Sequence, residues 1–593
     1  MSQYADRSTI QLLSRLLERK DRFRLAVSLV LILVGTFLEM LSLGIVIPVV
    51  RTIVGGDRRS AYSWLPEFAN RMSYDNFIRL LMAGLVGVFV VKNVFQLLST
   101  YFQQRVQLSI NNRLMQGMFE RYLQQPYEFH LMHSSSILLR NVQEYAGAVT
   151  SNGVGPALTL TTELLAGLSL LVVLVLVEPT ATIVIALFFI VSSVAVIRIS
   201  NIRTKRWGPE RIAHRGRIME SLLAGFGGIK EIKIFGRDEE VVVTHRVSLY
   251  GASRTAYLFS LAQSFPRAIF EIVAVASVAI VVVLSSISGA ATEDSLVILA
   301  LFGVVAFRML PSVNRIIGSV QQLSIGRAAL EGAVESFELP GSPSSQKMSR
   351  TKEPFKNLAV VNVKYCYPNL ETLAIDIGQL ELRAGESIGV VGASGSGKST
   401  LIDLLIGLLT PVSGTISMNG RDIVENPREW QDRIGYVPQH VYLMDTTIRR
   451  NVAFGIPEKS IDNQRVEESL QNANLWQFVQ SLPNGWDTVI GERGVRLSGG
   501  QRQRLGIARA LYGEPEVIVL DEATSALDVE TEREIVESLR EIVRNRTLIV
   551  VAHRASTLAY CSQLIRIEGG RIVQEGTFDE VVGSMTPLND KGQ

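Results

Sequence analysis

The chain has 593 residues, of which 47% are hydrophobic and 19% are charged, and its formal net charge is +3. One hydrophobic core does not normally serve a chain of this length, so at least two domains are expected. The small net charge and the lack of a long basic block argue against a nucleic-acid partner.

The first segment, MSQYADRSTIQLLSRLLERKDRFR, has no short apolar core followed by a small-residue cleavage site. We therefore expect it to be retained rather than removed as a signal peptide. Six later runs are close to the ~20 apolar residues that a helix needs to cross hydrocarbon. They cover residues 25–50, 77–102, 154–177, 180–199, 268–286 and 295–317. A soluble helical domain would need six such runs by chance, so we expect an all-α membrane domain.

The connections between these spans alternate between short and long. The long ones, at about 103–153 and 200–267, repeat apolar residues at three- and four-residue spacing, which predicts helical extensions rather than loops. They also hold many basic residues: Arg105, Arg113, Arg121, Arg140, Arg203, Lys205, Arg206, Arg211, Arg215 and Arg217. Because lysine and arginine mark the cytoplasmic side, we expect both long connections and both termini to face the cytosol.

Cationic residues also occur within or at the ends of the spans. Arg308 and Arg315 are seven residues apart, which is about two helical turns, so they share one helix face. Counted from the outer end of the span, Arg308 lies ~20 Å deep and Arg315 ~30 Å deep. Lys92 and Arg267 reach similar depths, ~22 Å and ~29 Å, in two other spans.

Two interpretations of these four cations are open. They could extend toward the cytoplasmic headgroups, as basic residues near span ends commonly do. Alternatively, they could form a basic patch in a central cavity that binds an anionic head such as a phosphate or pyrophosphate, to which arginine offers two parallel hydrogen bonds. Glu39, Glu163 and Glu271 also lie in spans and could neutralise part of such a patch.

A second domain follows a linker. The stretch ELPGSPSSQKMSRTKEP is rich in Pro, Gly, Ser and Lys, and short β-rich runs then alternate with helical patterns. This alternation predicts an α/β domain with a mainly parallel sheet. We therefore expect a membrane domain over residues 1–330, a linker over 331–356 and an α/β domain over 357–593. Cys366 and Cys561 lack metal-ligand spacing and are interpreted as reduced cytosolic thiols.

The segment GASGSGKS, residues 392–399, fits the phosphate-loop pattern G-x-x-x-x-G-K-S between a strand and a helix. In such a loop the backbone N–H groups surround the phosphates of ATP, Lys398 adds a positive charge, and the Ser399 hydroxyl can bind Mg²⁺. The residues expected to bind the nucleotide here are Gly392, Ser394, Gly395, Gly397, Lys398, Ser399 and Thr400.

About 120 residues further on, VIVLDEATSALD ends a buried strand with two carboxylates. Asp521 is expected to hold Mg²⁺ directly or through water, and Glu522 to orient or deprotonate the water that attacks the γ-phosphate. An acidic pair after a strand is weak evidence alone, but it is strong evidence after a phosphate loop.

The sequence RLSGGQRQRLGIARALY resembles the signature of ATP-binding cassette (ABC) proteins. The resemblance covers the whole chain, because six spans followed by one cassette is the layout of an ABC exporter half-transporter. Ser498, Gly499, Gly500 and Gln501 would form a second anion cradle at a helix N-terminus. The family places this cradle across a dimer from the phosphate loop, so the resemblance implies a homodimer that encloses two ATP molecules.

The same resemblance implies roles for other residues. Tyr367 matches the aromatic residue that stacks on adenine, and Gln439 matches the glutamine that contacts Mg²⁺ and water. Glu492 lies in the segment that contacts the membrane-domain helices. Asp528 ends the loop after Glu522, and His553 matches the histidine on the γ-phosphate. Residues 126–145 and 221–240 resemble the segments that couple the cassettes to the membrane domain.

The segments PRAIFE, RMLPSVNRII, IKIFGRDEE and IGYVPQHVYLMDTTIRRNVAFG resemble bacterial lipid-linked oligosaccharide flippases and related polysaccharide-export half-transporters. This resemblance implies an inner-membrane protein that hydrolyses ATP to move a lipid-linked, pyrophosphate-bearing substrate. Lys92 stands where an arginine is expected, which keeps the charge but loses the planar fork.

Other functions remain open. Within transport, these are a general lipid or hydrophobic-drug exporter and a peptide exporter. An ATP-gated channel or a membrane-bound regulator is an alternative from a different class. Intact Glu522 and His553 favour ATP turnover over simple switching.

Overall fold

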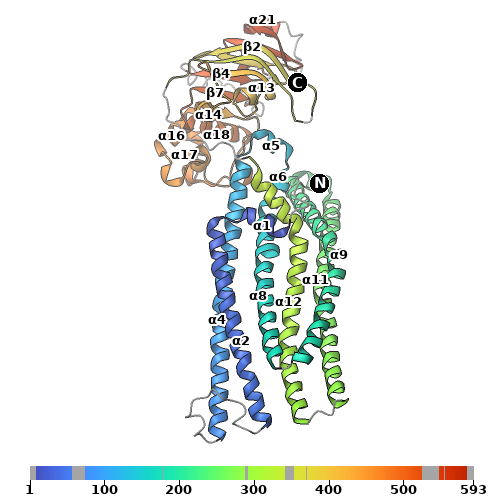
Figure 1. Ribbon diagram of the computed structural model, residues 1–593. Coiled ribbons are helices and arrows are strands. Elements are labelled where there is room, and N and C mark those ends of the chain that lie inside the picture. Colours follow the sequence, from blue (N-terminus) through green and yellow to red (C-terminus); the bar gives the residue numbers. More distant parts are fainter. Residues whose placement is uncertain are drawn as a thin grey trace. The chain divides into compact units, whose positions relative to one another are not determined.

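The computed structural model describes residues 8–55, 74–177, 179–287, 292–340, 353–368, 370–523, 546–552 and 554–583 (Figure 1). Contacts within the chain divide it into two compact units. The first unit comprises residues 1–125 and 133–341, and the second comprises residues 126–132 and 342–593. The short segment 126–132 therefore belongs with the C-terminal part of the chain rather than with the helices on either side of it in sequence.

Within the described residues, the first unit contains six helices of 23 to 50 residues. They are α2 (Arg19–Gly55), α4 (Tyr74–Leu123), α8 (Gly155–Val177), α9 (Pro179–Gly227), α11 (Asp238–Ile287) and α12 (Thr292–Glu338). The shorter helices are α1 (Thr9–Leu16), α6 (Ser135–Arg140), α7 (Ala146–Val149) and α10 (Ile229–Phe235). Two single π-helical turns, η1 (Asn141–Tyr145) and η2 (Thr150–Val154), flank α7. The helix α12 continues to Glu338, inside the range predicted as linker.

The long helices include stretches that are long enough to cross a membrane, and many of their exposed side chains are apolar. Three stretches of the described residues are long and apolar enough to cross a membrane: Arg19–Ser42, Ile78–Leu123 and Ser135–Val173. The other three predicted spans fall within α9, α11 and α12, many of whose side chains lie outside the described residues. On α2, α4 and α8, large apolar side chains are 58% to 71% exposed, namely Val30, Phe37, Val86, Leu97 and Leu168. Such extensive apolar exposure is typical of a surface that contacts lipid.

The amphipathic helix α1 covers one end of the first unit's core. It begins with a capping box in which the side chains of Ser8 and Gln11 satisfy each other's backbone N–H groups. Its Leu12 and Leu16 are buried with residues of α2, α4, α8 and α12. At the start of α2, the buried carboxylate of Asp21 pairs with Arg113 of α4 at 2.6 Å. A buried carboxylate requires such a partner, so the pair fixes α2 against α4.

The second unit is built on two sheets. Its strands are β1 (Asn357–Tyr365), β2 (Ile375–Arg383), β3 (Ser387–Val391), β4 (Ser413–Met418), β5 (Arg421–Asp422), β6 (Ile434–Val437), β7 (Val517–Asp521), β8 (Thr547–Val551), β9 (Gln563–Glu568) and β10 (Arg571–Gly576). The smaller sheet is antiparallel, in the order β2-β1-β4-β5. The larger has the order β10-β9-β3-β8-β7-β6 and is parallel except for β10. Every residue of β3 and β8 is buried, as expected for central strands covered on both faces.

Helices and short 3₁₀ turns complete the second unit. The helices are α5 (Tyr127–Met132), α13 (Lys398–Leu405), α14 (Pro427–Gln431), α15 (Ile448–Val452), α16 (Asn463–Asn472), α17 (Trp476–Ser481), α18 (Gly499–Tyr512), α20 (Ala555–Leu558) and α21 (Phe578–Gly583). The 3₁₀ turns are η3 (Glu458–Ser460), η4 (Gly485–Asp487) and η5 (Glu492–Gly494). This architecture matches the predicted α/β domain.

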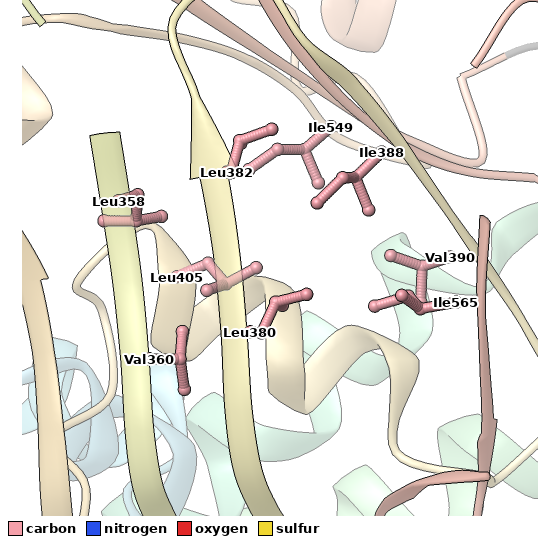
Figure 2. A pocket seen from close by; sticks show the side chains of 9 residues that line it. All are labelled: Leu358, Val360, Leu380, Leu382, Ile388, Val390, Leu405, Ile549 and Ile565. Atoms are coloured by element: carbon pink, nitrogen blue, oxygen red, sulfur yellow. The ribbon is translucent and has the colours of Figure 1, made fainter. Parts of the chain in front are cut away.

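The two sheets and α13 meet around a small apolar cavity. Figure 2 shows nine aliphatic side chains that line it, from β1, β2, α13 and the central strands β3, β8 and β9. Leu405 at the end of α13 is 3% exposed. Its carbonyl accepts a hydrogen bond from the indole N–H of Trp430 at 2.7 Å. This core supports the strand β3 and the helix α13, between which the phosphate-loop sequence lies.

Replacing Leu405 with Ala should therefore destabilise the second unit by about 2–5 kcal/mol, because the existing cavity is enlarged. The matched change Leu373→Ala, at a side chain that is 46% exposed, removes the same atoms from the surface. It should change stability by no more than about 0.5 kcal/mol. Denaturant unfolding of the full chain, followed by tryptophan fluorescence, measures both variants. Equal stabilities for the two variants would contradict the placement of Leu405 in this core.

Candidate functional site

The predicted phosphate loop connects β3 to α13 and has a backbone that requires glycine. The φ angles of Gly395 and Gly397 are +78° and +107°, in the left-handed region. A Cβ on Gly397 would also lie 3.0 Å from the carbonyl oxygen of Ala374. A side chain is therefore disfavoured by conformation at both positions, and at Gly397 by space as well.

Lys398 is the first residue of α13, and its side chain folds back over the loop. The residue is 6% exposed, and its ammonium donates hydrogen bonds to the carbonyls of Gly392 at 2.9 Å and Ala393 at 3.0 Å. Burial lowers the pKa of Lys398, and the carboxylates of Glu522 and Asp521 oppose that shift. The loop thus holds a partly desolvated cation between its own carbonyls and the two acidic residues after β7.

The acidic pair lies at the C-terminal end of β7. Glu522 has a φ of +48°, which is unusual for a residue with a side chain, and its N–H donates to the Val551 carbonyl at 2.9 Å. The side-chain amide of Gln439 donates a hydrogen bond to the Glu522 carboxylate. The structure therefore brings Gln439 and Glu522 into direct contact. A strained backbone of this kind occurs preferentially at functional sites.

Two residues that the sequence analysis did not single out lie near Asp521. The Tyr436 hydroxyl donates to Asp521 Oδ2 at 3.4 Å. Burial raises the pKa of Asp521, and the negative charge of Glu522 raises it further, whereas Tyr436 and Lys398 lower it. Burial, with a further contribution from Asp521, raises the pKa of Asp403 in α13 to about 6. Tyr436 lies three residues before Gln439 in the sequence, but only the fold places it beside Asp521.

These groups fit ATP with a divalent cation. Ser399 is exposed at the start of α13, so its hydroxyl is accessible. Burial and the nearby Glu522 carboxylate raise the pKa of Asp521, and a cation bound beside it would stabilise its charged form. Among the described residues, no group of three or more His, Cys, Asp and Glu side chains could hold a metal by itself.

Tyr367, expected to stack on adenine, lies beside the phosphate-loop helix. Its hydroxyl is 2.9 Å from the Thr400 hydroxyl. Its ring packs edge-on against Tyr365, with ring centroids 5.2 Å apart. The aromatic residue and the loop helix are thus connected by a direct hydrogen bond.

The signature residues begin α18. The Ser498 hydroxyl accepts from the Gln501 N–H at 3.2 Å, and the Gln501 side chain accepts from the Ser498 N–H at 2.8 Å. This capping box fixes the first turn of a 14-residue helix. Glycines at the next two positions leave their N–H groups uncovered by side chains, as the predicted anion cradle requires. Glu492 lies in the exposed turn η5, in the segment before this helix.

Three predicted positions cannot be placed. His553 and Asp528 lie outside the described residues, and so does the side chain of Arg308.

The helix α5, inside the first predicted coupling segment, packs within the second unit. Its Glu128 carboxylate accepts from the backbone N–H of Thr410 at 3.4 Å. Burial raises the pKa of Tyr365 above its ordinary value, and Glu128 adds to that shift. Burial and the Asp403 carboxylate likewise raise the pKa of Tyr127.

The helix α10, in the second predicted coupling segment, belongs instead to the first unit. Its Ile234 and Phe235 side chains are 68% and 71% exposed.

Three of the four cations that could form a substrate patch have described side chains, and all three are paired with carboxylates. Two pairs join different helices: Lys92 of α4 is 3.7 Å from Glu39 of α2, and Arg315 of α12 is 2.6 Å from Glu163 of α8. Arg267 pairs with Glu271 one turn away on α11, at 3.0 Å. All three predicted acidic residues therefore neutralise a predicted cation.

The exposure of these pairs differs. The Lys92 and Glu39 side chains are 13% and 8% exposed, so little of either charged group is accessible to a ligand. Glu163 is 7% exposed, whereas its partner Arg315 is 46% exposed. Glu163 holds the Nε edge of Arg315, and much of the guanidinium remains accessible.

Both units match models of one protein family. Residues 25–309 match the ABC transporter transmembrane region, and residues 376–525 match the ABC transporter family model. The chain belongs to the ABC transporter family, and its membrane-embedded helices and C-terminal cassette have the exporter fold predicted from the sequence.

Curated relatives are similar along most of their length. An ATP-dependent lipid A-core flippase of Thiobacillus denitrificans is 30% identical over 86% of this chain and 87% of its own. The protein of the same name from Photobacterium profundum is 28% identical over 98% of this chain and 97% of its own. A solved structure of a bacterial Atm1-family ABC exporter with ATP bound superposes with a TM-score of 0.78, covering 95% of this chain and 96% of that one, at 21% identity. At that identity the superposition supports the fold alone.

The raised pKa of Asp403 predicts a dependence of stability on pH. Its pKa in the folded chain, about 6, lies above the ordinary aspartate value of 3.8, so the folded cassette binds the proton more tightly than the unfolded chain does. The charged form is therefore destabilising at pH 7.5, and this cost is lost as the pH falls through 6 toward 4.

Asp403→Asn should accordingly raise the thermal unfolding midpoint at pH 7.5, and the gain should shrink toward pH 5. Glu371→Gln, at an exposed carboxylate of the same unit, is the matched control and should have little effect at either pH. A gain from Asp403→Asn that does not depend on pH would show that burial of Asp403 is not the cause.

Proposed function

We propose that this chain forms a homodimeric, ATP-hydrolysing exporter that moves an amphipathic, lipid-linked anion outward across the bacterial inner membrane. The observation that carries the ATP-driven part is the contact of Gln439 with Glu522, whose strained backbone lies beside the phosphate loop. The termini and the cassette would lie in the cytoplasm, following the positive-inside distribution. Support for a lipid substrate comes from the relatives, which are named lipid A-core flippases.

Each cassette residue is proposed to have a separate role in ATP hydrolysis. Lys398 and the N–H groups at the start of α13 would orient the phosphates. Mg²⁺, when bound, neutralises phosphate charge, and Ser399, Asp521 and Gln439 are the residues that would hold it. Glu522 would accept the proton of the attacking water, and its hydrogen bond with Gln439 supports this role by orienting the carboxylate. His553 and Asp528 are proposed at the γ-phosphate and the loop after Glu522 on the resemblance alone.

Two features support pairing of two chains. The capped N-terminus of α18 presents an anion cradle formed by Ser498 and the glycines after it. One chain has one cassette, so a partner chain would place this cradle over each bound ATP. The apolar side chains of Ile234 and Phe235 on α10 are exposed in the single chain, and a partner's cassette would cover them. Glu492 is proposed at the corresponding contact with the membrane-domain helices.

The substrate is proposed to bind through arginine. Arg315 lies near the inner end of its predicted span and keeps an accessible guanidinium edge, because Glu163 occupies only the Nε side. A pyrophosphate, as in a lipid-linked oligosaccharide, could accept two parallel hydrogen bonds from that edge. Lys92 and Arg267 would contribute positive charge only after separation from their carboxylates, and Arg308 is proposed on its spacing from Arg315 alone. Arg315 is therefore the residue on which the proposal is tested first.

Replacing Glu522 with Gln should retain ATP binding but reduce hydrolysis by at least about a hundredfold, because the water loses its base. ATP should then trap two chains in a closed dimer, which cross-linking or size measurements detect. The parent protein with ADP is the control and should not be trapped. Turnover close to that of the parent would contradict the role given to Glu522.

Replacing Arg315 with Ala should weaken transport of a pyrophosphate-bearing glycolipid into proteoliposomes about tenfold to a hundredfold, which is the value of one charge-assisted contact. Arg315→Lys should be intermediate, because it keeps the charge without the fork. Basal ATP hydrolysis should persist in both variants.

The matched control is Arg327→Ala, which removes the same residue type from the same helix. Arg327 also forms an ion pair, with Glu331 at 3.1 Å, but lies beyond the predicted span. It should not affect transport. Equal transport by the parent and Arg315→Ala at matched expression would leave Arg315 as a headgroup-facing residue. Transport of a phospholipid or cationic drug in preference to the glycolipid would instead favour a general lipid or drug exporter.

A further inference from the structure

The first unit contains a cavity of about 310 Å³ that the proposed transport cycle does not use. Its walls come from three parts of the chain: the segment from η1 to η2, the helix α9, and the helix α12. Its polar lining residues are Gln143, Glu144, Ser151, Asn152, Arg211 and Arg215. This is the size of a small-molecule site rather than of a single water site.

The two π-helical turns supply one wall. The turn η1 carries Gln143 and Glu144, and η2 carries Ser151 and Asn152. A π turn inserts an extra residue into a helix and so rotates its side chains out of the regular register. Such turns are rare and are concentrated at functional sites. Here they aim four polar side chains at one cavity.

The charges on the walls do not balance. Arg215 pairs with Glu144 at 3.2 Å. Arg211, one turn before Arg215 on α9, makes no hydrogen bond or ion pair with any residue that the structure describes. Burial lowers the pKa of Arg211 and repulsion from Arg215 lowers it further, whereas the negative charge of Glu144 opposes these shifts. Two guanidinium groups against one carboxylate leave one positive charge, so an anion is the favoured occupant.

Close backbone contacts keep the walls in place. A Cβ on Gly208 of α9 would lie 2.7 Å from the Ile325 carbonyl oxygen of α12. A Cβ on Gly326 of α12 would lie 2.4 Å from the Cβ of Asn152. The three parts are therefore packed directly against one another around the cavity, and the side of α12 that lines it consists of Ile325 and Ala329.

The position of the cavity along α9 indicates where the anion comes from. Arg211 lies twelve residues beyond the end of the predicted span at residue 199, which is about 18 Å along a helix. A phospholipid headgroup at the membrane surface does not extend that far into the cytosol. A soluble anion reaches the cavity without leaving water.

We propose that this cavity is a binding site for a small soluble anion that carries phosphoryl groups. Arg211 would bind the anion with its planar fork, and Arg215 would contribute charge while it remains paired with Glu144. The amides of Gln143 and Asn152 can donate further hydrogen bonds. The site is separate from the phosphate loop, because all of its residues belong to the first unit.

Inorganic pyrophosphate is a suitable probe, provided that the cassettes are filled first. Radiolabelled pyrophosphate is titrated by equilibrium dialysis into the purified full-length protein in saturating Mg-ADP. The parent should bind one pyrophosphate per chain, and Arg211→Gln should weaken binding about tenfold or more. Arg217→Gln removes the same charge from an exposed position on the same helix and should bind like the parent. No binding to the parent, or equal affinities for the parent and Arg211→Gln, would overturn the proposal.

A second variant separates loss of the site from loss of the fold. Gly147 lines the cavity, and a Cβ placed on it meets nothing within 4 Å. Gly147→Leu should therefore fill the cavity, favour the helix α7 and leave the charges in place. It should abolish pyrophosphate binding while the thermal unfolding midpoint stays at or above that of the parent. Full pyrophosphate binding by Gly147→Leu would show that the anion binds elsewhere.

The same assay identifies the source of the phosphoryl group. Nanodiscs containing phosphatidic acid are compared with nanodiscs of phosphatidylcholine alone. Equal pyrophosphate binding in both is expected for a site that takes a soluble anion. Loss of pyrophosphate binding only in the presence of phosphatidic acid would mean that a lipid headgroup occupies the cavity, and would overturn the soluble-anion assignment.

Discussion

The ammonium of Lys398 is almost fully buried at the start of α13, where the carbonyls of Gly392 and Ala393 accept its hydrogen bonds. A charge removed from water destabilises the fold unless other groups replace its solvation. The strand β3, the glycine-rich turn and the apolar core behind α13 together hold those carbonyls in place. Because Asp521 and Glu522 are part of the same electrostatic group, the acidic end of β7 also depends on this arrangement.

The same constraint distinguishes the charges of the first unit. In the pair of Lys92 and Glu39, the carboxylate is buried, the lysine side chain is only 13% exposed, and each supplies the counter-charge of the other. Arg315 is different, because one edge is held by Glu163 while the rest is accessible. Arg211 is the least compensated of the three, since it is partly desolvated beside a second guanidinium group. From Lys92 to Arg315 to Arg211, the positive charge is therefore less and less compensated by a neighbouring carboxylate.

Local motifs were readable from the sequence because neighbouring residues build them. The phosphate loop, the acidic end of β7 and the capped start of α18 each lie within a few consecutive residues, and the structure has them where they were expected. The pairing of Arg315 with Glu163 was only a possibility in the sequence, because it joins two helices whose relative rotation depends on packing. The contact of Tyr436 with Asp521 and the π turns around α7 were not anticipated. The former requires adjacent parallel strands, and the latter breaks the periodicity from which helices are inferred.

The assignment of residues 126–132 to the second unit changes how the cassette is attached. The backbone passes between the units after Gln125, after Met132 and after Gly341, so there are three covalent crossings instead of one. A domain attached by a single backbone link can rotate about that link. A domain that contains a short helix from between two helices of the other unit is joined through the backbone to both of those helices, here α4 and α6. The number of covalent links between the two units is therefore set by chain connectivity together with the packing of α5 in the second unit.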